Sequence, residues 1–154
     1  MLKLNSKAPA FSLKDKDAKI HSLNKMDSDY VVIFFYPKDN TPGCTLESIG
    51  FSNLLAKFKK LNATIVGISG GDAKSKLKFC EKHKLKLIML SDPEFKISAK
   101  YGVYGEKSFM GKKYMGITRT TFILNKSKKI IQVYPKVKPF SHPEAVLEYM
   151  KSVS

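Results

Sequence analysis

Residues 31–44 read VVIFFYPKDNTPGC, an apolar run that passes through a short polar turn to a cysteine. The first six residues are all β-branched or aromatic, which is typical of a buried central strand. Pro37 and the turn residues up to Gly43 stop that strand and turn the chain. The sequence therefore predicts a central strand and a tight loop that leads to Cys44.

A helix is expected directly after this loop. Apolar side chains recur at helical spacing from Thr45 onward, namely Leu46, Ile49, Phe51, Leu54, Leu55, Phe58 and Leu61. Cys44 then lies in the first turn, where unpaired backbone N–H groups and the positive end of the helix dipole favour a thiolate. Free cysteine is also among the most buried residue types, so a structural role is the alternative. The strand-to-helix turn behind a Pro and a Gly favours the reactive thiol.

Two long motifs resemble those of the peroxiredoxins. YPKDNTPGCT at residues 36–45, with Glu47 after it, resembles their active-site loop, and the nearest group is PrxQ, also called bacterioferritin comigratory protein. YGVYGEK at 101–107 and GKKYMGITRTTF at 111–122 agree with the same group and follow in its order. The resemblance covers the chain from about Lys7 to the C-terminus.

The resemblance implies a thiol peroxidase that reduces hydrogen peroxide or an organic hydroperoxide. Cys44 would be the peroxidatic nucleophile and would become a sulfenic acid. The Thr41 hydroxyl would orient the peroxide, Pro37 would shield the thiolate, and Arg119 would hold the thiolate and the peroxide oxygens. The residue chemistry agrees, because charge that builds on the departing oxygen needs a hydrogen-bonding hydroxyl and a fixed cation. The implied electron donor is thioredoxin or a similar thiol reductant, and a monomer is common in this group.

Arg119 also stands out by composition. Of the 28 basic residues, 27 are Lys, and Arg119 is the one Arg. A planar guanidinium bonds two acceptors in one fixed geometry, which an ammonium does not do. A surface arginine without a role is the alternative. The position of Arg119 just before the apolar strand Thr121 to Leu124 favours the site.

The second cysteine leaves two mechanisms open. Many PrxQ proteins carry a resolving cysteine five residues after the peroxidatic one, where this chain has Ile49. Cys80, 36 residues after Cys44, is the candidate resolving cysteine, as in a minority of that group. Cys80 also shares a helical face with Ala73 and Leu77, so it could be a silent core residue while an external thiol completes the cycle. A disulfide needs Cα atoms within about 7 Å, and we expect Cys44 and Cys80, on two separate helices, not to meet that limit without local unfolding.

The predicted class is α/β with a thioredoxin-like fold, in which helices flank a central mixed β-sheet and an N-terminal β-hairpin is present. Residues 1–154 are expected to form one domain, because this length with 43% apolar content suffices for a core. The expected strands are 9–13, 19–23, 31–36, 63–69, 87–90, 121–124 and 129–134.

Three further expectations concern the loops and the C-terminal part of the chain. Residues 102–116 are expected to form a long, glycine-punctuated loop that delivers Arg119. Ser141 is expected to cap a final helix with Pro143 in its first turn. The three histidines, His21, His83 and His142, are interpreted as surface residues.

Two other functional classes are weighed against the peroxidase. The net charge of +15 raises nonspecific nucleic-acid binding, but the lysines are spread along the chain, only one arginine could read bases, and no known recognition motif appears. A thiol-disulfide oxidoreductase of the thioredoxin type needs Cys-x-x-Cys, whereas Glu47 stands three residues after Cys44. No metal-ligand cluster, signal peptide or stretch of about 18 apolar residues appears, so we expect no metal, no cofactor, no membrane span and a cytoplasmic location.

Overall fold

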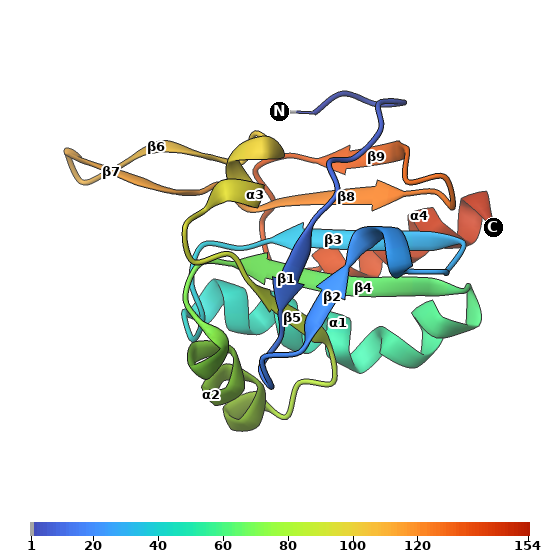
Figure 1. Cartoon of the computed structure of the whole chain (residues 1–154), viewed down its shortest axis with the longest axis horizontal. Helices are drawn as coiled ribbons and strands as arrows, with labels where there is room; N and C mark the ends of the chain where they lie inside the picture. The colour runs from blue at the N-terminus through green and yellow to red at the C-terminus, as the bar shows by residue number, and fades with distance from the viewer. Residues whose placement is uncertain (1) are drawn as a thin grey trace.

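A seven-stranded mixed sheet forms the centre of the protein (Figure 1). The structure is a computed structural model that describes residues 2–154. Its strand order is β2-β1-β5-β4-β3-β8-β9. The strands are β1 (Ser12–Lys14), β2 (Ile20–Ser22), β3 (Tyr30–Phe35), β4 (Ala63–Ser69), β5 (Ile88–Ser91), β8 (Thr120–Leu124) and β9 (Ile130–Tyr134). Strands β3, β4 and β5 are parallel, whereas β8 runs antiparallel to β3 and β1 runs antiparallel to β5.

The predicted central strand is confirmed as β3. Five of its six residues, Val31 to Phe35, are fully buried, because β4 and β8 pair with its edges and side chains cover both of its faces. Burial on both faces explains why this strand reads as a continuous apolar run rather than an alternating one.

Helices and the N-terminal segment cover the two faces of the sheet. The helices are α1 (Pro42–Lys60), α2 (Ala73–His83), α3 (Lys96–Lys100) and α4 (His142–Val153), and η1 (Leu23–Lys25) is a short 3-10 helix. One core cluster joins side chains of α1, α2 and α4, among them Phe51, Phe79 and Val146. The other cluster joins Phe11 of the N-terminal segment, Leu23 of η1 and Ile97 of α3. The apolar core therefore has two layers, one on each face of the sheet.

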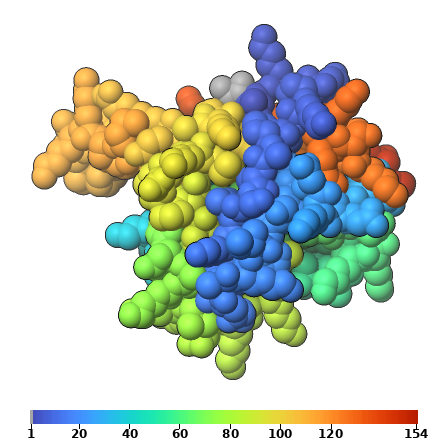
Figure 2. Space-filling model, in the orientation of Figure 1, coloured from blue at the N-terminus to red at the C-terminus, as the bar shows by residue number. Residues whose placement is uncertain are grey.

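The N-terminal hairpin is confirmed, since β1 and β2 pair antiparallel. The prediction of a long loop over residues 102–116 is wrong. Strands β6 (Tyr104–Phe109) and β7 (Lys112–Ile117) form an antiparallel hairpin there, which projects from the body of the molecule (Figures 1 and 2). Met110 and Gly111 at its tip both have positive φ angles, 52° and 77°, as a two-residue hairpin turn requires. The mixed polar and apolar residues of this segment gave no clear strand pattern.

The final helix is confirmed, but its predicted cap is not. Ser141 stands at the N-cap position with φ 61°, and its side chain makes no capping hydrogen bond. Helix α4 is held at its start by packing instead. A Cβ at Gly50 of α1 would lie 2.7 Å from Cγ of Pro143, so the glycine lets the first turn of α4 rest directly on α1.

Candidate active site

Cys44 lies in the first turn of α1, which begins at Pro42, and its side chain is fully buried. Thr41 stands at the N-cap with extended backbone but makes no capping hydrogen bond. Its hydroxyl instead donates to the carbonyl oxygen of Lys38 at 2.9 Å. The N–H groups of the first turn therefore have no side-chain cap, and the positive end of the helix dipole lies at the thiol.

The guanidinium of Arg119 contacts the sulfur. Its Nη2 lies 3.4 Å from Cys44 Sγ, and its Nη1 donates to Oε1 of Glu47 at 2.9 Å. Burial opposes the charge of Arg119, but attraction to Cys44 and Glu47 outweighs it, so the pKa of the guanidinium is raised. Gly43 gives the guanidinium room, because a Cβ there would stand 3.0 Å from Nη2. The structure thus brings together the thiol and the arginine that the sequence singled out.

Glu47 is a site residue to which the sequence reasoning gave no role. It follows Cys44 by three residues, which places both on one face of α1, and this spacing could have identified it. Its side chain is fully buried, and burial raises the pKa of its carboxyl to about 7 in spite of the Arg119 partner. Within residues 2–154, its Oε2 has no hydrogen-bond partner.

His142 is buried, so its interpretation as a surface residue is wrong. Its Nε2 lies 2.8 Å from Oγ1 of Thr121 and 4.0 Å from Oε2 of Glu47. The ring meets Phe51 and Tyr134 edge-on, with ring centroids 5.9 Å and 5.1 Å away. Burial lowers the pKa of His142 to about 4, with a further contribution from the charge of Arg119. The imidazole is therefore neutral near pH 7.

The other two predicted residues of the loop are only partly buried. Pro37 lies two residues after the end of β3, and Thr41 lies three residues before Cys44 at the end of the same loop. The loop between them contains Asn40 in the left-handed region at φ 61°. The roles assigned to Pro37 and Thr41 toward a peroxide remain predictions, since they concern a bound substrate.

Cys80 lies on α2 and is 3% exposed, as its apolar helical face predicted. It belongs to the same core cluster as Cys44, and both cysteines are free thiols. Burial raises the pKa of the Cys80 thiol, with opposing contributions from nearby charges. Burial therefore favours the neutral thiol of Cys80, whereas Cys44 has the contact with Arg119.

The β6–β7 hairpin adds a second cation. The Nζ of Lys107 donates to the carbonyl oxygen of Ile117 at 2.9 Å and lies 5.9 Å from the ring centroid of Tyr114. Burial lowers the pKa of Lys107, Arg119 lowers it further, and the charge of Cys44 acts in the opposite direction. Lys107 of the hairpin thus adds a positive charge that interacts with Arg119 and Cys44.

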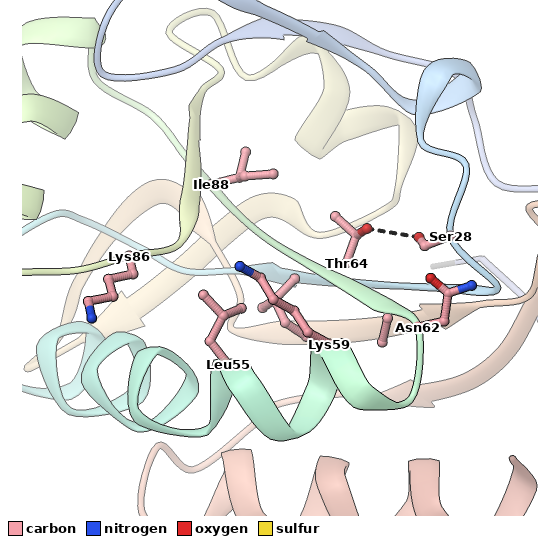
Figure 3. Close-up of a pocket in the computed structure, with 9 residues that line it drawn as sticks. Ser28, Leu55, Lys59, Asn62, Thr64, Lys86 and Ile88 are labelled. Atoms are coloured by element: carbon pink, nitrogen blue, oxygen red, sulfur yellow. Dashed lines mark hydrogen bonds between the residues drawn. The ribbon is translucent and has the colours of Figure 1, made fainter.

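A surface pocket lies at the other end of the parallel strands (Figure 3). It is lined at the end of α1 and the start of β4 by residues such as Leu55, Lys59 and Ala63, and the hydroxyl of Thr64 donates there to Ser28 Oγ at 2.8 Å. It holds neither cysteine. Cys44 lies at the opposite end of the sheet, beyond the C-terminal end of β3.

Neither a metal site nor a membrane-spanning helix is found in the part of the chain that the structure describes. Across residues 2–154, no group of three or more His, Cys, Asp or Glu side chains is placed to hold a metal ion. None of the helices in this range is long and apolar enough to cross a membrane.

Comparisons with known proteins agree with one another. The AhpC/TSA family profile matches residues 4–133. Peroxiredoxin Bcp of Escherichia coli K12 is 37% identical over 150 residues, which cover 97% of this chain and 96% of that protein. The curated relatives therefore match the chain over nearly its full length.

Solved structures give the same result. The bacterioferritin comigratory protein of Xanthomonas campestris superposes with a TM-score of 0.87 at 34% identity, over 93% of this chain and 91% of that one. A cysteine-to-serine variant of Xylella fastidiosa PrxQ gives a TM-score of 0.93 at 29% identity, over 99% and 98%. The predicted thioredoxin-like α/β fold with a central mixed sheet is thereby confirmed.

Proposed function

The chain belongs to the AhpC/TSA family and is a peroxiredoxin of the Bcp/PrxQ group, and we propose that Cys44 is its peroxidatic cysteine. The observation that carries this proposal is the 3.4 Å contact between Arg119 Nη2 and Cys44 Sγ in the uncapped first turn of α1. A thiolate is the nucleophilic form of cysteine, and both the helix dipole and the guanidinium stabilise it. Cys80 has neither.

The first step is attack of the Cys44 thiolate on one oxygen of the peroxide. A bond forms between sulfur and that oxygen, the O–O bond breaks, and the departing oxygen takes a proton to leave as water or an alcohol. Arg119 stabilises the charge that builds on the oxygens, and Glu47 fixes the guanidinium through its 2.9 Å ion pair. Thr41 would orient the peroxide, and Pro37 would keep water from the thiolate.

The second step joins Cys44 to Cys80. The Cys80 thiol attacks the Cys44 sulfenic acid, a disulfide forms, and water leaves. Serine variants of Xanthomonas campestris peroxiredoxin Q were made at two cysteines whose positions differ by 36, the same separation as between Cys44 and Cys80. The alternative is a one-cysteine cycle in which an external thiol reduces the sulfenic acid and Cys80 is structural.

The substrate and partners follow from the same chemistry. Hydrogen peroxide or an organic hydroperoxide is the oxidant, and alkyl peroxide reduction is the activity described for the Xanthomonas campestris protein. Thioredoxin or a similar thiol would reduce the disulfide. We further propose one monomeric domain without a cofactor, a membrane partner or a specific nucleic-acid partner. A cytoplasmic location fits two free thiols.

The intact mass of the reduced protein after one equivalent of hydrogen peroxide tests this proposal, with free thiols blocked immediately afterwards. A loss of about 2 Da with no blockable thiol is the expected result. A gain of about 16 or 32 Da with Cys80 still blockable would leave the one-cysteine cycle. An unchanged mass would contradict the peroxidatic role of Cys44, and the Cys44→Ser variant supplies the matched blank.

A further inference from the structure

A second buried ion pair lies on the far side of the active-site loop from Arg119. Lys76 of α2 is fully buried, and its Nζ donates to Asp39 Oδ2 at 2.9 Å, to Ser69 Oγ at 2.9 Å and to the carbonyl oxygen of Gly70 at 2.6 Å. An ammonium has three N–H donors, so every one of them is used. Burial lowers the pKa of Lys76, and attraction to Asp39 opposes that shift.

Asp39 is the partner from the active-site loop. Its Oδ1 accepts from the hydroxyl of Tyr36 at 2.7 Å, and its Oδ2 also accepts from Ser75 Oγ of α2 at 2.6 Å. Asp39 lies two residues before Thr41 and five before Cys44. One carboxylate therefore joins the end of β3, the peroxidatic loop and the first turn of α2.

Tyr36, at the start of the loop, also meets Phe79 of α2, with ring centroids 6.0 Å apart. A pocket lies between the rest of the loop and the start of α2, lined by residues that include Pro37, Asn40, Gly70 and Phe95. Gly71 has φ 87°, and a Cβ there would lie 3.3 Å from Ser75 Oγ and 3.5 Å from Asp39 Oδ2. Gly70 and Gly71 thus precede α2 at the end of the helix that contacts Asp39.

The same helix carries Cys80, four residues after Lys76 and so on the same helical face. Cys44 and Cys80 are free, buried thiols on two different helices. Helix α1 packs on α4 and β4, whereas α2 packs on β5. Bond formation needs the two Cα atoms within about 7 Å, and the two thiols are unbonded on separately packed helices, so we take α2 as the helix that moves when Cys80 reaches Cys44. Such a movement also pulls Lys76 away from Asp39.

We propose that Asp39 and Lys76 are positioning residues that hold α2 closed while peroxide reacts, and that their separation sets the rate at which Cys80 reaches the Cys44 sulfenic acid. The inference rests on the proposed function, because it takes Cys80 as the resolving cysteine. Breaking a buried ion pair is costly, since each charge must be rehydrated or left unpaired. The pair therefore opposes opening of α2 and favours the closed site.

Two reactions then compete for the sulfenic acid. With α2 open, the Cys80 thiol displaces water and a disulfide forms. With α2 closed, a second peroxide transfers one oxygen to the sulfur, gives a sulfinic acid and leaves as water or an alcohol. A stronger hold on α2 therefore shifts the protein toward the sulfinic acid, and a weaker hold shifts it toward the disulfide.

The test compares Lys76→Met and the milder Ser75→Ala with the wild-type protein. Lys78→Met is the matched control, because Lys78 is an exposed lysine of the same helix. Leu147→Ala, a core change in α4, controls for a general loss of stability. Three quantities are measured: amide hydrogen exchange of α2 in the reduced protein, the rate of disulfide formation after a pulse of hydrogen peroxide, and the peroxide concentration that converts half of Cys44 to the sulfinic acid.

In Lys76→Met we expect faster exchange in α2 and disulfide formation faster by about tenfold, with the half-conversion concentration raised by the same factor. Ser75→Ala should show the same three changes at about threefold, because it removes one hydrogen bond and leaves the ion pair. Both controls should keep the wild-type ratio of disulfide to sulfinic acid.

The inference is overturned if both variants fold and form the disulfide at the wild-type rate, or if Leu147→Ala shifts the ratio as much as Lys76→Met does. If the wild-type protein forms no disulfide at all, the proposed role of Cys80 fails and the inference fails with it. Faster α2 exchange in Lys76→Met without faster disulfide formation would reduce the ion pair to a structural contact. These outcomes separate an error about the ion pair from an error about Cys80.

Discussion

Two buried ion pairs flank the loop between β3 and α1, and they differ in how completely their hydrogen-bonding groups are used. In the Lys76–Asp39 pair, all three N–H groups of the lysine and both oxygens of the carboxylate have partners. In the Arg119–Glu47 pair, one carboxylate oxygen has no partner among the described residues, and the second guanidinium nitrogen points to a thiol.

This difference separates a structural contact from a chemical one. A fully bonded pair can only lose interactions when it is disturbed, so it fixes the position of the segments that it joins. A cation with a free donor beside a sulfur can gain interactions when negative charge forms there. We therefore propose that the Arg119–Glu47 pair, called the open pair, acts in the step with peroxide, and that the Lys76–Asp39 pair, called the closed pair, fixes the positions of the loop and α2.

The largest effect on stability is expected from the closed pair. Lys76→Met leaves Asp39 as a buried carboxylate without its cation, and the free energy of unfolding should fall by about 3–5 kcal/mol. Urea unfolding at pH 7 measures it. The exposed control Lys78→Met should stay within about 0.5 kcal/mol of wild type. Equal losses in the two variants would contradict the assignment of a tight pair to Lys76.

A change in the Arg119–Glu47 pair should instead lower the rate of the reaction with peroxide. Arg119→Lys keeps a positive charge but loses the planar fork that reaches both Cys44 and Glu47, and we expect kcat/KM for hydrogen peroxide to fall by about 100-fold. Stopped-flow measurement under second-order conditions gives this constant. Lys112→Met, an exposed cation of β7, is the control. A loss of less than about threefold would break the comparison, because Arg119 would then resemble the closed pair.

The pH dependence of stability tests the surroundings of the Arg119–Glu47 pair, where Glu47 and His142 lie close together. The pKa of Glu47 is about 7 in the folded protein against an ordinary value of 4.5. Its contribution to the free energy of unfolding is therefore present at low pH and is lost as pH rises. The pKa of His142 is about 4 in the folded protein against an ordinary value of 6.5. Its contribution to the free energy of unfolding is therefore present above pH 6.5 and is lost as pH falls. Between pH 4.5 and 6.5 the two slopes oppose each other.

Removing one group should therefore reveal the other. On acidification from pH 6.5 to 4.5, Glu47→Gln should lose about 2–3 kcal/mol of unfolding free energy, and His142→Gln should gain a similar amount. Urea unfolding at both pH values measures the difference between the two variants, in which other titrating groups cancel. Slopes of the same sign would show that Glu47 and His142 do not titrate as the burial of each side chain implies.

The smallest effect is expected from a single hydrogen bond of the closed pair. Tyr36→Phe removes the hydroxyl that donates to Asp39 Oδ1 and should lower the free energy of unfolding by about 1–2 kcal/mol. Tyr149→Phe is the matched control, because its hydroxyl makes a 3.3 Å bond to Ile131 on a half-buried ring. Urea unfolding compares the two, and a loss as large as that of Lys76→Met would place the strength of the cluster in Tyr36 rather than in the ion pair.

Much of the fold could be predicted because its signals are local. The six apolar residues of β3, the helical spacing after Cys44 and the turn residues between them each occupy one short stretch of sequence. The β6–β7 hairpin escaped because its strands are exposed: Phe109 is 64% and Met110 88% exposed, and no buried face imposes an alternating pattern.

The site divides in the same way. Cys44 and Arg119 could be predicted from the motif and from the composition. Lys76 could not, because it reads as one of several lysines of α2, and only the tertiary structure shows that Asp39 draws it inside. His142 escaped for the same reason, since the residues that surround it, Phe51, Thr121 and Tyr134, come from distant parts of the chain. Burial of a polar residue is set by its partners, which lie far away in the sequence.

Because Arg119 is the single arginine of the chain, cleavage after it can report on the opening of the site. An arginine-specific protease has one bond to cut in this chain, between Arg119 and Thr120. The folded protein protects that bond, since the arginine is mostly buried, its carbonyl oxygen accepts from Val137 N at 2.8 Å, and Thr120 opens a buried strand. A digest would therefore yield intact protein or two fragments, 1–119 and 120–154. The cleavage rate would report how often this part of the molecule opens.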